Sequence, residues 1–208
     1  MRGVRRIPLS RRSHIIGFQA FQASGLTEHE SALERDFVTL TSFCDASVKI
    51  VSQPVTLSFL DGSQSRRYTP DFLVLWSDGT SELIEVKYRE DLKKQWRRLR
   101  AALICARTWA REHGATLRIA TERSIRGPFL ENARRLLALR TAPLDRVLAD
   151  QLRSTFDSLT DPTFGLLVAA VHHDRAAVLG ALWRMIARGE LCVDLTAPIG
   201  FQTRLTLP

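Results

Sequence analysis

The chain has 208 residues, of which 45% are hydrophobic and 25% charged, the composition of an ordinary globular protein. Its 30 Lys and Arg side chains outnumber 22 Asp and Glu, for a formal net charge of +8. Residues 1–140 hold 24 basic and 15 acidic side chains, and residues 141–208 hold 6 and 7. A positive field confined to one segment fits a surface that meets a polyanion, although an Arg-rich soluble protein without such a partner is the alternative.

Membrane association is not expected. The longest apolar run, residues 165–171, is far below the roughly 20 residues that a spanning helix needs. The basic N-terminus lacks the apolar segment of a secretory signal. Three scattered cysteines without CxxC spacing predict reduced thiols and no zinc site, so we expect a cytoplasmic protein.

The N-terminal region begins with an irregular arm over residues 1–27. A helix is predicted over residues 28–41, because apolar residues recur there at helical spacing after a capping-box pattern at Thr27 and Glu30. Asp36 is expected on the exposed face of that helix. The basic side chains of the arm are candidates for tracking a DNA groove, unless the arm makes no fixed contacts: Arg5, Arg6, Arg11 and Arg12.

Strand patterns follow the predicted helix. Residues 48–59 contain strand-like sequence that is interrupted at Pro54. Two further strands are predicted over residues 68–76 and 82–88, joined by a strong turn signal at 77–80.

A long amphipathic helix is predicted over residues 91–112, with Trp96 on its apolar side. Its basic side could be a solvated surface or could hold phosphates, for which the candidates are Lys93, Lys94 and Arg97. A strand over 116–121 and a helix ending near Arg140 come next. The alternation of helices and strands predicts an α/β domain with a mixed sheet.

The predicted domain boundary is Thr141-Ala142-Pro143. Residues 141–208 are mostly helical and close with strand-like pieces at 191–195 and 201–205, which suggests a small winged-helix-like domain. Its nearly balanced charge favours protein docking over DNA binding. The motif His172-His173-Asp174 resembles a metal cluster, but a surface or helix-end role is the favoured interpretation.

The sharpest chemical signal is Asp71 opening one predicted strand and Glu85 and Lys87 closing the next. Hydrolysis of a phosphodiester needs a cation at the phosphate and an activated water, and carboxylates are hard ligands for Mg²⁺. Alternation puts Glu85 and Lys87 on one face of their strand. The alternative is a pair of surface charges.

Strand register tests this interpretation. A three-residue loop at 78–80 places Asp71 opposite Lys87, with all three side chains on one face. A two-residue loop turns Asp71 to the other face unless a bulge intervenes. We predict the three-residue loop or a compensating bulge. Glu34, at the edge of the predicted helix's apolar stripe, is either a cation ligand or the partner of a nearby basic residue, Arg35 or Lys49.

Ordered blocks between about residues 5 and 140 resemble the TnsA family, the restriction-endonuclease-like subunits of heteromeric transposases in cut-and-paste transposons, including CRISPR-associated ones. The blocks are residues 30–37, 53–54, 68–74, 83–87 and 121–126, together with Asn132. The resemblance implies a PD-(D/E)xK mixed sheet flanked by helices for residues 1–140. Residues 141–208 match the family's C-terminal domain only loosely.

The resemblance also implies a role for each candidate residue. Glu34 corresponds to the helical catalytic glutamate, Asp71 to the central metal ligand, Glu85 to the second-strand ligand and Lys87 to the catalytic lysine. Some relatives carry Gln in place of Glu85. The implied cofactor is Mg²⁺, with two ions held by the three carboxylates and with Mn²⁺ able to substitute. Gln53 fits a family position as well, but Gln before Pro equally suits a turn.

The implied activity is cleavage of the 5′ ends of a transposon in a bacterial cytoplasm. A TnsB-like DDE recombinase would process the 3′ ends, and a TnsC-like AAA+ ATPase would contact the C-terminal domain. Two alternatives remain: a stand-alone repair or junction-resolving nuclease of the same fold, and a non-catalytic DNA-binding or scaffold protein.

Overall fold

The computed structural model describes residues 17–21, 25–29 and 31–208, and contacts divide the chain into two compact units, Met1–Arg126 and Gly127–Pro208. The division therefore falls before helix α4 (Pro128–Leu139) and not after it, where the sequence placed the boundary, because α4 packs against α7 (Arg175–Ala187) in the second unit. The four arginines of the N-terminal arm, Arg5, Arg6, Arg11 and Arg12, lie outside the described residues.

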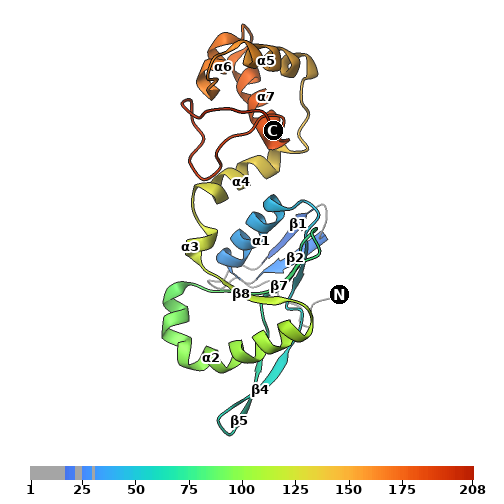
Figure 1. Cartoon of the computed structure of the whole chain (residues 1–208), viewed down its shortest axis with the longest axis vertical. Helices are drawn as coiled ribbons and strands as arrows, with labels where there is room; N and C mark the ends of the chain where they lie inside the picture. Colours follow the sequence, from blue (N-terminus) through green and yellow to red (C-terminus); the bar gives the residue numbers. More distant parts are fainter. Residues whose placement is uncertain (1–16, 22–24, 30) are drawn as a thin grey trace. The chain divides into compact units, whose positions relative to one another are not determined.

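The first unit is built on a four-stranded mixed sheet with the order β3-β6-β7-β8. Figure 1 labels two of its strands, β7 and β8. Strand β6 is antiparallel to both β3 and β7, whereas β7 runs parallel to β8. A parallel pair needs a crossover connection, and helix α2 supplies it. The bounds are β3 (Lys49–Ser52), β6 (Phe72–Leu75), β7 (Ser81–Val86), α2 (Arg89–Glu112) and β8 (Thr116–Ala120).

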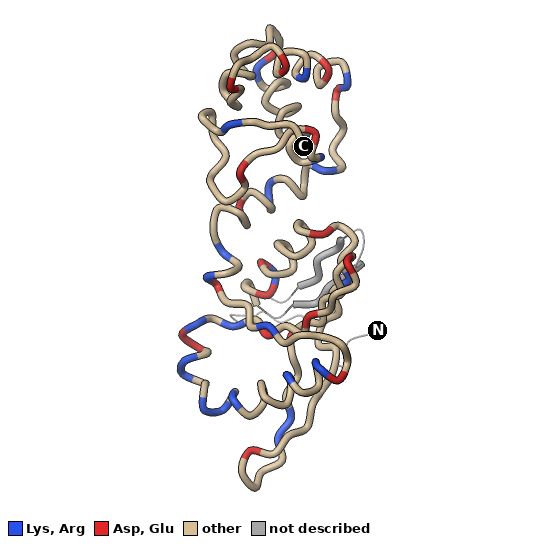
Figure 2. Tube along the Cα trace, in the orientation of Figure 1, with Lys and Arg blue, Asp and Glu red and all other residues tan. Residues whose placement is uncertain are grey.

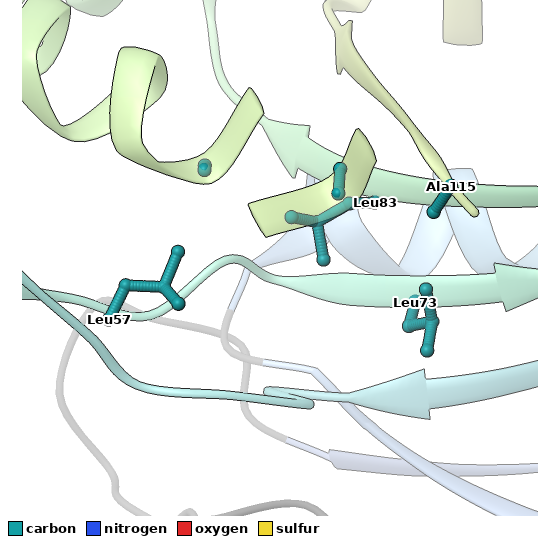
Figure 3. Close-up of a cluster of buried hydrophobic side chains, with 6 residues drawn as sticks. Leu57, Leu73, Leu83 and Ala115 are labelled. Atoms are coloured by element: carbon teal, nitrogen blue, oxygen red, sulfur yellow. The ribbon is translucent and has the colours of Figure 1, made fainter. Parts of the chain in front are cut away.

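Two helices cover opposite faces of this sheet (Figure 1). On one face, Phe37 of α1 (Ala32–Cys44) stacks on Phe72 with 5.6 Å between ring centroids. On the other face, residues of β6 and β7 pack with alanines of α2 in a buried cluster (Figure 3) that consists of Leu57, Leu73, Leu83, Ala106, Ala110 and Ala115. Since strand side chains alternate, Asp71 and Glu85 belong to the α2 side.

Two hairpins accompany the sheet. Strands β1 (Gly17–Phe21) and β2 (Gly25–His29) pair antiparallel, so the prediction of an irregular arm continuing to residue 27 was wrong. The helix accordingly begins later than predicted, at Ala32, and its cap is not Thr27 but Ser31, whose Oγ accepts the N–H of Glu34 at 3.1 Å.

The second hairpin, β4 (Leu57–Asp61) with β5 (Gln64–Tyr68), divides one of the predicted strands. The sequence predicted a continuous strand over 68–76, but Tyr68 ends β5 and Phe72 begins β6. Pro70 lacks an N–H and cannot continue a ladder, and the chain bends at Asp71. Because of this break, the hairpin lies beside α2, and Asp71 lies directly before the first residue of β6.

Two expectations about burial were also wrong. Asp36 is only 2% exposed, because Arg126 and Arg35 approach its carboxylate at 3.0 and 3.6 Å. Trp96 is 48% exposed, because α2 turns its small residues, and not this side of the helix, toward the sheet.

The second unit packs α4, α5 (Arg146–Ser158), α6 (Phe164–Ala170) and α7 around buried leucines. The two strand-like pieces predicted near the C-terminus form isolated antiparallel bridges, Cys192 with Thr206 and Arg204 with Thr163, and not a regular hairpin. The exposed pair His172-His173 belongs to no metal-binding cluster among the described residues, and Asp174 caps α7 by accepting the N–H of Ala177 at 2.8 Å.

Within the described ranges, no helix combines the length and apolar character that crossing a membrane requires.

Candidate active site

The β6–β7 turn sets the register of the candidate site. Trp76 N–H donates to Thr80 O at 2.9 Å, so the loop is Ser77–Gly79, with Gly79 at a φ of +88°. The loop has the predicted three residues but starts one position earlier. The strand pairing, continued by one residue beyond Phe72 and Ile84, places Asp71 opposite Glu85 and not opposite Lys87.

Asp71 nevertheless lies on the predicted face, because this register differs from the expected one by two residues and side chains alternate with a period of two. Its own N–H donates to Ile84 O at 3.1 Å, and its Oδ2 accepts the N–H of Val86 at 2.6 Å. The carboxylate is therefore anchored to the backbone of β7 beside Glu85. The backbone N–H of Lys87 donates to Ala120 O at 3.0 Å, which extends the β7–β8 ladder up to the candidate lysine.

Glu85 is held by a donor on each oxygen. Lys87 Nζ lies 3.0 Å from Oε1, and the Tyr68 hydroxyl donates to Oε2 at 2.5 Å. Glu85 is only 3% exposed, so the ammonium group and the hydroxyl fix the orientation of a buried carboxylate.

The electrostatics of the site are dominated by buried negative charge. Burial, followed by the charges of Glu85 and Glu34, raises the pKa of Asp71 well above its ordinary value, against the opposing effects of the Val86 N–H and Lys87. Burial and the neighbouring Glu85 carboxylate likewise raise the pKa of Tyr68. A bound cation would offset the negative charge that raises the pKa of Asp71.

These groups line a hollow of about 480 Å³ between the sheet, the β4–β5 hairpin and α2. Its lining includes Asp71, Glu85 and Lys87, all three predicted from the sequence. It also includes residues that the sequence reasoning missed, namely Tyr68 and Arg66, Arg67, Gln95 and Arg98. The dipeptide Arg66-Arg67 directly before Tyr68 was a visible signal, but only the hairpin fold brings it to the site.

Glu34 occupies a different position. It is half-buried on α1, the helix that covers the other face of the sheet, and it does not line the hollow. The negative charge of Glu34 nevertheless contributes to the raised pKa of Asp71. Within the described part of the chain no three His, Cys, Asp or Glu side chains form a ready-made metal cluster. Mg²⁺ is commonly held by only one or two carboxylates together with water and substrate phosphates, so Asp71 and Glu85 fit such an ion.

The other sequence candidates are arranged as follows. Lys93, Lys94 and Arg97 are exposed on α2 but do not line the hollow, and Lys94 lies 3.6 Å from Glu90. Gln53 is buried with a φ of +46°, and its N–H donates to Asp71 O at 2.7 Å. The turn that Gln53 forms is thus attached to the backbone of Asp71.

Asn132 makes side-chain hydrogen bonds to the backbone within the second unit. Its Nδ2 donates to the carbonyl oxygens of Leu195 and Ala197, each at 2.9 Å. This buried amide holds the C-terminal loop against α4.

A family model described as "TnsA-like endonuclease N terminal" matches residues 44–122. The matched segment contains Asp71, Glu85 and Lys87 and both walls of the hollow, whereas Glu34 lies before it. No curated protein matches the chain. The mixed sheet, the grouped carboxylates and lysine, and the family match agree with one another: residues 44–122 are similar to the N-terminal endonuclease domain of TnsA-like proteins.

Proposed function

We propose that this protein is a Mg²⁺-dependent DNA endonuclease that cuts the 5′ ends of a transposon, acting with a TnsB-like recombinase and a TnsC-like AAA+ ATPase. The observation that carries the proposal is the meeting of Asp71, Glu85 and Lys87 in one hollow of a TnsA-like domain. A nuclease in a transposition system needs such a group of carboxylates and a lysine at an accessible surface.

Asp71 and Glu85 would hold the cation, and Glu34 would contribute to a second ion through water or the substrate. A bound divalent ion supplies neutralisation of charge at the scissile phosphate and lowers the pKa of a coordinated water. Lys87 Nζ orients the attacking water, a role supported by its position 3.0 Å from Glu85 Oε1. Attack on phosphorus breaks the bond to the 3′ oxygen and leaves a 5′ phosphate and a 3′ hydroxyl.

The second unit would be a winged-helix-like docking domain for the ATPase. Support comes from its helices, from the antiparallel bridge between Cys192 and Thr206, and from the near balance of acidic and basic side chains in residues 141–208. A main DNA-binding surface would carry a clearer positive excess.

The test is a cleavage assay with transposon-end DNA, the recombinase partner and the full chain, in which the 5′ ends are mapped. Cleavage should require Mg²⁺, stop with a chelator and be lost in Asp71→Asn, which keeps an oxygen to accept the Val86 N–H. Cleavage by Asp71→Asn at the wild-type rate would refute the proposal. Efficient cutting of branched DNA by the chain alone would instead indicate a stand-alone nuclease.

A further inference from the structure

The β4–β5 hairpin extends away from the sheet alongside α2 (Figure 1). At its base Leu57 joins Ala106 and Ala110 in a buried cluster (Figure 3), and Cys105 Sγ of α2 lies 3.9 Å from Ser58 O of β4. A hydrogen bond of 2.9 Å between the hydroxyl oxygens of Thr56 and Thr69 joins the two chain segments at the base of the hairpin. Hairpin and helix are therefore two walls held in a fixed relation, with the candidate active site between them.

Basic residues occur on both walls (Figure 2), and Arg66 and Arg67 of the hairpin and Arg98 of α2 line the hollow. Arg66 is neutralised on the hairpin, since its Nε lies 2.9 Å from Asp61 Oδ2. Arg67 on the hairpin and Arg98 on α2 are exposed, and no carboxylate in the described ranges lies within ion-pair distance of either. The hollow thus presents one uncompensated guanidinium group on each side of its acidic floor.

An acidic floor repels a nucleic acid backbone, so a nuclease of this shape needs cations where the strand enters and leaves. Guanidinium groups suit this task because they bind phosphate oxygens through two parallel hydrogen bonds. Their partner here is a repeating phosphodiester and not a small anion, since the two groups lie on separate walls with the reacting centre between them.

We propose that Arg67 and Arg98 hold the phosphates that flank the scissile one, forming a clamp on the DNA backbone across the candidate active site. The clamp rests on the proposed nuclease function and adds to it the residues that position the strand. The clamp contacts phosphates and not bases, so it contributes equally to the binding affinity for every DNA sequence. Recognition of particular transposon ends must then come from elsewhere.

Helix α2 offers a matched control. Arg107 is also exposed and is likewise without a carboxylate partner in the described ranges, but it follows Arg98 by nine residues, which at about 100° per residue is half a turn away on the helix surface. Arg107 does not line the hollow. Arg107→Ala removes the same charge from the same helix on the opposite side.

The test measures binding of the full chain to duplex DNA of mixed sequence in EDTA over a series of salt concentrations. The double variant Arg67→Ala/Arg98→Ala should lower the slope of log K against log salt by about 1.8, the value for two phosphate contacts at roughly 0.9 each. The loss should be the same for a second, unrelated duplex, and Arg107→Ala should leave the slope near that of the wild type. Thermal unfolding of all variants, whose substituted side chains are exposed, should match the wild type.

An equal loss in Arg107→Ala, or an unchanged slope in the double variant, overturns the clamp. So does a wild-type chain that binds no DNA at low salt. Because binding is measured without metal, the result is separate from the cleavage assay: a clamp that binds DNA in a chain that never cuts would count against the nuclease function and not against the clamp.

Discussion

Tyr68, the last residue of the β4–β5 hairpin, donates a 2.5 Å hydrogen bond to Oε2 of Glu85 in the central sheet. With Lys87 on Oε1, this bond fixes the plane of the carboxylate. Tyr68→Phe removes only the hydroxyl. We expect the Mg²⁺ concentration for half-maximal cleavage to rise about tenfold, since loss of a partner to a metal ligand typically weakens metal binding about 10- to 100-fold.

The chain contains one other tyrosine, Tyr88, which provides the control. Its ring lies under Arg126, with the guanidinium carbon 5.4 Å from the ring centroid, and it does not line the hollow. Tyr88→Phe should leave the Mg²⁺ titration unchanged. If Tyr68→Phe also leaves it unchanged, Tyr68 does not position Glu85 for metal binding.

Asp71→Asn should raise thermal stability in metal-free buffer at neutral pH. The pKa of Asp71 is raised in the folded state, mainly by burial, so the folded protein binds a proton more tightly than the unfolded chain. The wild type therefore loses stability as the pH rises from the ordinary aspartate range toward the folded pKa, and the amide removes this loss. Mg²⁺ should raise the melting temperature of the wild type and leave Asp71→Asn unaffected.

Asp45→Asn supplies a control of opposite sign. The Asp45 carboxylate accepts the N–H groups of Ser77 and Ser47, each at 2.8 Å, and these bonds lower its pKa. Its contribution to stability is present above the ordinary aspartate pKa and is lost as the pH falls through the lowered value, so Asp45→Asn should melt earlier at neutral pH. A wild type that melts later than Asp71→Asn in EDTA at pH 7 would contradict the electrostatic account.

The candidate site was largely predictable because strand alternation survives an error of two residues. The loop was placed one residue late, yet Asp71 and Glu85 still fell on one face. The burial of Asp36 was not predictable, since its partner Arg126 lies 90 positions away in the sequence. Nor was the role of Tyr68, because the sequence pattern did not show that this residue ends a separate hairpin, β4–β5, whose fold brings its hydroxyl to Glu85.

Lys87→Ala should reduce cleavage by at least about 100-fold while the fold is retained, since a group that assists proton transfer typically contributes about 10²- to 10⁴-fold. The lysine side chain is 24% exposed, so its removal leaves no large cavity. The control is Lys94→Ala, an exposed lysine that lies 3.6 Å from Glu90 outside the hollow. Measured as single-turnover cleavage at saturating Mg²⁺, equal rates for Lys87→Ala and the wild type would show that Lys87 does not assist the attacking water.

The buried carboxylate of Asp36 predicts an asymmetric response to losing either partner of its ion pair with Arg126. Arg126→Ala removes the nearer of the two arginines from a carboxylate that is only 3% exposed, and should cost about 1–3 kcal/mol once screening of the 44% exposed guanidinium is allowed for. Asp36→Asn leaves Arg126 free to turn toward water and should cost less. Urea unfolding of the two variants compares the free energies, and a larger loss in Asp36→Asn would show that the charge of Asp36 is itself the stabilising element.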